Sequence, residues 1–244
     1  MFRVSKKWQS HFFNTLNRLH RKSVQAALFK AGVIAEMNTI IFIIEILGTI
    51  AFAVSGVMVA KNKNMDLFGV CMLGITTGCG GGIIRDVIIG NTPPAMFVNP
   101  VYALVALATS LIICIPFISK FLGSLKSAGE VALQVLDAVG LGGFTVVAVV
   151  NAYSLFPDNI FLMIFVGCVT GCGGGVLRDI FAGDIPYIFR KHIYASASIA
   201  GALLCALLIP VIGTTASMIC GIVLIMLIRF LAAYYKLNLP RMHN

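Results

Sequence analysis

Residues 77–93 read TGCGGGIIRDVIIGNTP, and residues 170–186 read TGCGGGVLRDIFAGDIP. The two stretches are identical at ten of 17 positions and lie at a constant offset of 93 residues. Each lies in an apolar segment long enough to cross a membrane, where consecutive glycines and an Arg-Asp pair are both unfavourable. Because this unfavourable pattern occurs in both halves of the chain, it indicates an internal repeat with a role in transport or in helix packing.

The composition indicates an integral membrane protein of the all-α class. The 244 residues are 59% hydrophobic and 11% charged, whereas a soluble domain has about 25% charged residues. The apolar runs are about 20 residues long, as in membrane helices, which argues against an outer-membrane barrel. The net charge of +9 does not indicate nucleic-acid binding, because the basic residues lie in loops and termini, where they set membrane orientation.

Seven transmembrane helices are predicted, at residues 38–60, 65–90, 99–119, 131–151, 158–183, 191–210 and 214–234. A second motif opens the first and fourth of them, as Glu45-x-x-Gly48-x-x-x-Phe52 and Asp137-x-x-Gly140-x-x-x-Phe144. Spans one to three and four to six are therefore predicted to be two copies of one unit. Because each unit has an odd number of spans, the copies enter the membrane from opposite sides and form inverted repeats.

The predicted organisation has four parts. They are a basic N-terminal extension (1–36), a first three-helix repeat (37–126), a second repeat (127–213), and a seventh helix with a cytoplasmic tail (214–244). Lys and Arg occur in the loops after spans one, three and five and in the C-terminal region, but not after spans two, four and six. This distribution predicts a cytoplasmic C-terminus and a first span that begins outside the cytoplasm.

The basic extension contradicts that orientation, because it places seven Lys and Arg residues on the external side. One explanation is that Met37 is the native start, since it leads directly into the first span. Another is an amphipathic interfacial helix, with Phe12 and Phe13 among basic neighbours. We favour the first explanation.

The two glycine triplets have two interpretations. Glycine costs about 1 kcal/mol relative to alanine in a helix interior, so each triplet favours a kink, which is tolerated where freed carbonyls face a water-filled path. Alternatively, the glycines allow close helix packing. The neighbouring threonine hydroxyls either face a permeating ion or bond back to their own helix. We favour the kink, and the candidate path residues are Thr77, Gly80, Gly81, Gly82, Thr170, Gly173, Gly174 and Gly175.

Charged residues inside spans usually face the interior of the helix bundle and are paired. The candidates are Glu45, Arg85, Asp86, Asp137, Arg178 and Asp179. Adjacent helical residues point about 100° apart, so each Arg is expected not to pair with the Asp that follows it. The inverted symmetry favours crossed pairs, with Arg85 bound by Asp179 or Asp137 and Arg178 by Asp86 or Glu45. The cluster is interpreted either as a structural lock or as part of an ion path.

No catalytic constellation is present, so the chain is not expected to be an enzyme, and no cofactor is expected. There is no HExxH, no Walker loop and no CxxC, and the seven cysteines lie in apolar stretches, as packing residues do. No metal site is expected beyond transient monovalent cations.

The doubled GGGxxRD, the acidic-xxGxxxF motif and the segment from Lys61 to Gly69 resemble the prokaryotic branch of the trimeric intracellular cation channel family. Bacterial members of that family are often labelled glycine transporter domain proteins. The resemblance covers residues 37–232 and implies a homotrimer in the inner membrane, surrounded by lipid, with a separate pore through each protomer. It also implies that spans two and five line the pore and are kinked at the glycine triplets. The animal relatives' Lys-Val-Glu-like sequence is absent, so regulation assigned to it is not carried over.

Two functions follow from these patterns. The first is a monovalent cation channel for K⁺ or Na⁺, chiefly K⁺ as the resemblance implies, in which carbonyls and threonine hydroxyls replace part of the ion's hydration shell. The alternative is a secondary transporter of glycine or another small zwitterion, in which Arg85 or Arg178 contacts the substrate carboxylate. A scaffold without transport is disfavoured, since it assigns no role to the glycines.

Overall fold

The computed structural model describes residues 39–115, 126–190 and 193–235. The chain divides into two compact units, Met1–Ile41 and Phe42–Asn244, and the architecture below is that of the second. The extension predicted at 1–36, its possible start at Met37 and its possible interfacial helix lie outside the described residues.

The described residues form helices and no strands, which confirms the all-α membrane class. Six helices are long and apolar enough to cross a membrane. They are Thr39–Asn62, α2 (Leu67–Ile89), α6 (Lys126–Leu155, of which Gln134–Leu155 is the apolar part), α7 (Ile160–Phe181), α9 (Ala195–Ile212) and α10 (Thr214–Tyr234). Two short helices, α3 (Ala95–Val98) and α8 (Tyr187–Arg190), follow α2 and α7.

The third predicted span differs from the observed helix. Instead of residues 99–119, α4 covers Val101–Cys114 and has 14 residues, which give a rise of about 21 Å. The helix ends because Ile115 has an extended ψ of 129° and precedes Pro116, and proline disfavours the helical conformation in the residue before it. The described part of the chain thus has six long apolar helices and one shorter one.

The two glycine-rich helices have clear local start signals. The Asp66 side chain accepts a hydrogen bond from Gly69 N at 2.7 Å, and the Asn159 side chain accepts one from Leu162 N at 2.9 Å. Such N-caps satisfy main-chain donors that have no partner inside the helix. Both α2 and α7 continue as α-helix through their triplets, and the kink stays a prediction.

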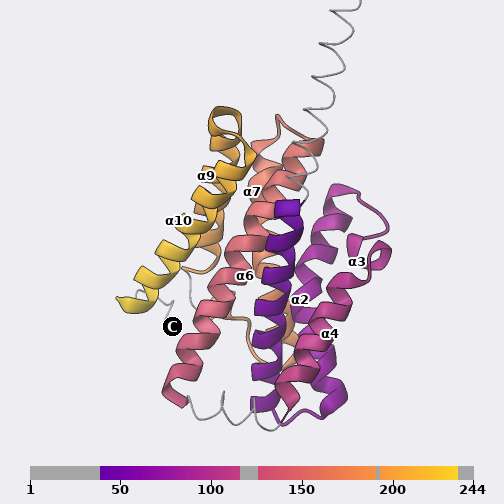
Figure 1. The fold of residues 1–244 in the computed structure, drawn as a ribbon. Coiled ribbons are helices and arrows are strands. Elements are labelled where there is room, and N and C mark those ends of the chain that lie inside the picture. Colours follow the sequence, from indigo (N-terminus) through magenta and orange to yellow (C-terminus); the bar gives the residue numbers. More distant parts are fainter. Residues whose placement is uncertain (1–38, 116–125, 191–192, 236–244) are drawn as a thin grey trace, which may run out of the picture. The chain divides into compact units, whose positions relative to one another are not determined.

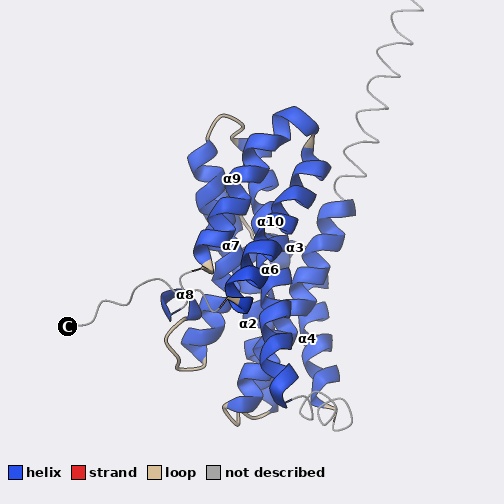
Figure 2. Cartoon of the chain, turned by 90° about the vertical axis from the view of Figure 1, so that its left-hand side faces the viewer, coloured by secondary structure: helices blue, strands red, loops and turns tan. Residues whose placement is uncertain are grey.

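The triplet helices α2 and α7 pack directly against each other (Figure 1). The α2 helix also contacts α4, and α7 also contacts α6 and α9. The α10 helix packs beside α9 and against α6, as the two views show (Figures 1 and 2). Residues of α2 and α7 therefore lie at the centre of the helix contacts.

The acidic-xxGxxxF motif forms a reciprocal contact between the first helix and α6. The Phe52 and Phe144 rings lie 5.4 Å apart between centroids. A Cβ at Gly140 would lie 2.5 Å from the Phe52 ring, and one at Gly48 would lie 3.2 Å from the Phe144 ring. Each glycine therefore makes room for the phenylalanine of the other copy.

Candidate ion path and charge clusters

The triplets meet where α2 crosses α7. A Cβ at Gly81 would overlap the carbonyl oxygen of Thr170, and a Cβ at Gly174 would overlap that of Thr77. A Cβ at Gly173 would lie 3.3 Å from the Cα of Gly81. At these positions the glycines let two main chains touch, as in the close-packing interpretation.

The threonine hydroxyls beside the triplets bond back to their own helices. Thr77 Oγ1 donates to Leu73 O, and Thr170 Oγ1 donates to Val166 O, both at 2.6 Å. Both threonines have no exposed surface. The hydroxyls therefore bond back to their own helices rather than face a permeating ion. This bond satisfies each hydroxyl donor inside the bundle.

The third glycine of each triplet faces polar side chains rather than the opposite helix. A Cβ at Gly82 would have Arg85 Nη2 as its nearest neighbour, at 4.0 Å. A Cβ at Gly175 would lie 3.1 Å from the Tyr194 hydroxyl and 3.7 Å from Asp137 Oδ1. The triplets therefore combine two functions: packing at the crossing, and space beside a charged cluster.

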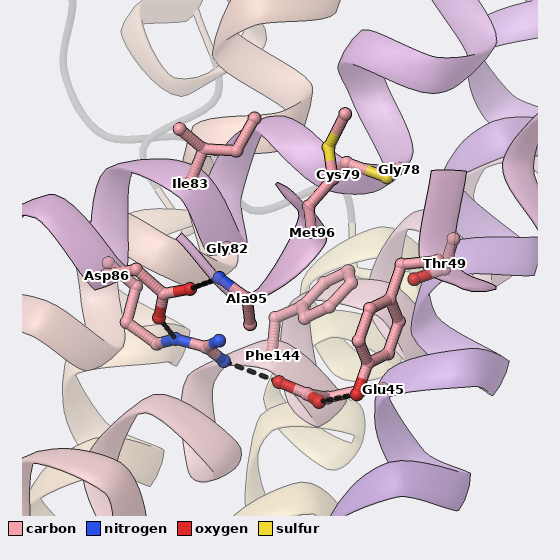
Figure 3. Close-up of a pocket in the computed structure, with 12 residues that line it drawn as sticks. Glu45, Thr49, Gly78, Cys79, Gly82, Ile83, Asp86, Ala95, Met96 and Phe144 are labelled. Carbon is pink, nitrogen blue, oxygen red and sulfur yellow. Dashed lines mark hydrogen bonds and ion pairs between the residues drawn. The ribbon is translucent and has the colours of Figure 1, made fainter. Parts of the chain in front are cut away.

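The first charged cluster lies on the first helix, α2, α3 and α4 (Figure 3). Arg85 donates from Nη1 to Glu45 Oε1 at 2.6 Å and from Nε to Asp86 Oδ1 at 2.8 Å. The remaining carboxylate oxygens accept hydrogen bonds from the Tyr102 hydroxyl at 2.7 Å and from Ala95 N at 2.8 Å. The first cluster is defined as Glu45, Arg85, Asp86 and Tyr102. Its three charged residues are buried, Tyr102 is half-buried, and every carboxylate oxygen is bonded.

The second charged cluster, defined as Asp137, Arg178, Asp179 and Arg229, repeats the arginine–carboxylate pairs of the first with one addition. Arg178 Nε donates to Asp179 Oδ1 at 2.8 Å, and Arg178 Nη1 donates to Asp137 Oδ1 at 3.2 Å. Asp179 Oδ2 accepts from Tyr187 N at 2.7 Å, as Asp86 does from α3 in the first cluster. The addition is Arg229 of α10, whose Nη2 lies 3.6 Å from Asp137 Oδ2.

The predicted crossed pairing is wrong. Arg85 pairs with Glu45 and Arg178 with Asp137, so each arginine binds the acid of its own copy. A hydrogen bond from Arg178 Nη1 to the Ser55 hydroxyl ties the second cluster to the first helix. The contacts of Gly81 with Thr170 and of Gly174 with Thr77 run antiparallel. Arg85 and Arg178, which both follow the triplets, therefore lie toward opposite ends of the α2–α7 crossing, and crossed pairs do not form.

The prediction that neighbouring Arg and Asp residues do not pair is also wrong. In both copies the arginine binds the aspartate that follows it. The backbone directions differ by about 100°, but the long arginine side chain bends back so that its Nε reaches the neighbouring carboxylate.

Sequence reasoning missed three residues of the clusters. Tyr102 and Tyr194 lie at an offset of 92, like Glu45 and Asp137, and this shared offset was the available signal. From sequence, Arg229 is one of the basic residues of the C-terminal region that favour a cytoplasmic C-terminus. It is instead buried, with 8% exposure, and its position inside an apolar span was the sign of a buried partner.

A cavity lies beside the first cluster. It has a volume of about 30 Å³, which is room for about two water molecules. Glu45, Arg85, Asp86 and Tyr102 line its polar side, and Phe144 and Met96 line its apolar side (Figure 3). The space is large enough for water or one small desolvated ion, and too small for an ion with a complete hydration shell.

The sequence matches the glycine transporter family over residues 42–116 and 134–210. The inner membrane protein YadS of Escherichia coli K12 is 36% identical over 204 residues, covering 82% of this chain and 95% of the relative. A membrane protein of Vibrio cholerae is 35% identical over 205 residues, covering 83% of each chain.

Solved structures of TRIC cation channels are similar in fold. One, described in work on conductance through TRIC cation channels, is 32% identical with a TM-score of 0.74, covering 83% of this chain and 97% of that one. The TRIC trimeric intracellular cation channel orthologue from Rhodobacter sphaeroides is 30% identical with a TM-score of 0.74, covering 82% of this chain and all of that one.

Proposed function

This chain belongs to the glycine transporter family, and from that premise we propose that it is a monovalent cation channel of the bacterial inner membrane, conducting chiefly K⁺. Its similarity to TRIC cation channels supports this proposal over most of the chain's length. We also propose a homotrimer with one path through each protomer, because the Rhodobacter sphaeroides relative is described as trimeric. The Lys and Arg distribution favours a cytoplasmic C-terminus.

The observation that carries the proposal is the first cluster beside its cavity. Glu45 and Asp86 supply two carboxylates, whereas Arg85 supplies one guanidinium. The surplus negative charge lies next to a space of about 30 Å³. Negative charge at low dielectric raises the local concentration of cations and lowers that of anions.

We propose that the path passes Gly82 and Gly175, beside the closed α2–α7 crossing, and that it opens there when the helices kink. The other candidate residues lie at the crossing: Thr77, Gly80, Gly81, Thr170, Gly173 and Gly174. A kink there would turn their carbonyls toward the path and widen it. We further propose that the two three-helix units are inverted repeats, as their equivalent ion pairs and glycine contacts favour.

A carrier for glycine requires a guanidinium free to contact the substrate carboxylate. Arg85 and Arg178 are only 4% and 5% exposed, and each binds two carboxylates. Because their charges are already compensated, the described contacts favour the channel over the carrier.

The test is single-channel recording on the purified protein in planar bilayers, with labelled glycine uptake into liposomes from the same preparation. The channel predicts unitary K⁺ currents and no saturable glycine exchange. Gly82→Ala places a methyl group at the cavity and should lower K⁺ conductance several-fold. Gly142→Ala is the matched control, because a Cβ there meets Ile222 at an ordinary 3.6 Å. Saturable glycine exchange without unitary currents would refute the channel.

A further inference from the structure

The two charged clusters differ in net charge. In the first, Arg85 is opposed by Glu45 and Asp86, so one carboxylate charge stays uncompensated. In the second, Arg178 and Arg229 oppose two carboxylates, so the described charged groups balance. The difference arises from α10, which belongs to neither three-helix unit.

Arg229 enters the second cluster over aromatic rings. Its guanidinium carbon lies 4.7 Å from the Tyr194 ring centroid and 5.6 Å from that of Tyr187. Cation–π contacts of this kind hold a positive charge where water is excluded. Within the described residues, Arg229 Nε has no hydrogen-bond partner. The side chain is thus held by ring faces and by its approach to Asp137, rather than by a full set of hydrogen bonds.

The equivalent tyrosines Tyr102 and Tyr194 also differ in their hydrogen bonds, and the difference lies where Arg229 approaches the second cluster. In the first cluster the Tyr102 hydroxyl donates to Glu45 Oε2 at 2.7 Å. The equivalent oxygen in the second cluster, Asp137 Oδ2, faces Arg229 at 3.6 Å. The hydroxyl of Tyr194 is buried and has no hydrogen-bond partner in the described part of the chain. A charged group therefore stands where the first cluster has a neutral hydroxyl.

We propose that Arg229 is a tethered counter-cation that makes the ion path asymmetric. It compensates Asp137 and so occupies the place that a permeating cation would take in the second cluster. The permeating ion then rests beside Glu45 and Asp86 and passes the second cluster without binding there. This inference rests on the proposed channel function and assigns to a residue of the seventh helix the role of setting where the cation binds.

Charge variants of one pair test the idea. Arg229→Gln leaves a surplus carboxylate charge in the second cluster and should create a second resting site for K⁺. One unit charge about 4 Å away changes ion affinity by about fivefold when it is screened as in bulk water, and by more in a less polar path. The half-saturating K⁺ concentration should fall by that factor, and the maximal conductance should fall because a tightly held ion leaves slowly.

Two further variants separate charge from structure. Arg229→Lys keeps the charge and should stay near wild type in half-saturation. The double variant Arg229→Gln with Asp137→Asn removes one charge of each sign and should also return toward wild type. Asp137→Asn alone gives the second cluster a surplus positive charge and should raise the half-saturating K⁺ concentration. The double variant can then be compared with Asp137→Asn, so the rescue is measurable even if Arg229→Gln alone does not assemble.

The measurement is unitary conductance over a wide range of K⁺ concentrations, with trimer content and melting temperature recorded on the same samples. Opposite shifts for the two single variants and their mutual rescue support the proposal. Equal half-saturation in all variants that conduct, or shifts that the double variant does not reverse, would overturn it. A wild-type protein without K⁺ current would refute the proposed channel itself, which is a separate and recognisable outcome.

Discussion

Alanine at Gly81 and alanine at Gly82 should have opposite effects on stability, although the two positions are adjacent on one helix. Alanine is favoured over glycine in a helix interior by about 1 kcal/mol, and this gain applies at both. At Gly81 the new Cβ would overlap the carbonyl oxygen of Thr170, a main-chain atom that moves only if α2 and α7 separate. Such overpacking costs about 1–3 kcal/mol. At Gly82 the nearest neighbour would be Arg85 Nη2, at 4.0 Å.

Gly81→Ala should therefore lower the melting temperature of the purified protein, whereas Gly82→Ala should leave it unchanged or raise it. At about 2–4 °C per kcal/mol for a chain of this size, the two variants should differ by several degrees. The assay is thermal unfolding in detergent followed by loss of the folded peak in size-exclusion chromatography. Ion flux should not follow stability in these two variants, because Gly82→Ala should conduct K⁺ poorly while its melting temperature stays high. Equal melting temperatures for the two variants would refute the contact between the triplets.

Three smaller effects are expected from single contacts, each measured as a melting temperature. Tyr102→Phe removes a hydrogen bond to the Glu45 carboxylate and should destabilise by about 1.5–3 kcal/mol. Tyr194→Phe is the control, because it removes a hydroxyl with no hydrogen-bond partner among the described residues. An equal fall in melting temperature in both variants would contradict a stabilising Tyr102–Glu45 hydrogen bond. Asp66→Ala removes the N-cap of α2 and should cost about 1 kcal/mol, and Asp66→Asn, which keeps an acceptor, should lose less. Lys63→Ala breaks an exposed ion pair worth at most about 1 kcal/mol, so a shift that survives high salt would count against a purely electrostatic contact.

Local patterns predicted most of the helices. The seventh helix was expected at 214–234 and is observed at Thr214–Tyr234, and the second was expected at 65–90 and is observed at Leu67–Ile89. Hydropathy and capping residues are properties of a short stretch of chain, so they can be read without knowing its neighbours. The third helix was predicted too long, although Pro116 already marked its end.

The pairing of charges could not be predicted in the same way. Sequence patterns showed which residues were unfavourable in a membrane, and inverted symmetry suggested crossed partners for Arg85 and Arg178. The observed partners depend on how far each helix is rotated and how deep it lies, and these follow from packing of the whole bundle. Arg229 was overlooked for the same reason, because only the position of α10 beside the second cluster makes it a partner of Asp137.

Hydropathy and residue spacing are enough to identify a helical membrane protein with the same motif in each half, because both are properties of a single segment. Three features come from the folded bundle: Gly81 and Gly174 each contact the main chain of the other helix, each arginine binds the acids of its own half, and α10 adds a cation to the second cluster alone. These outcomes depend on contacts between segments far apart in the chain. In a low-dielectric interior, a displacement of a few ångströms changes which charge compensates which.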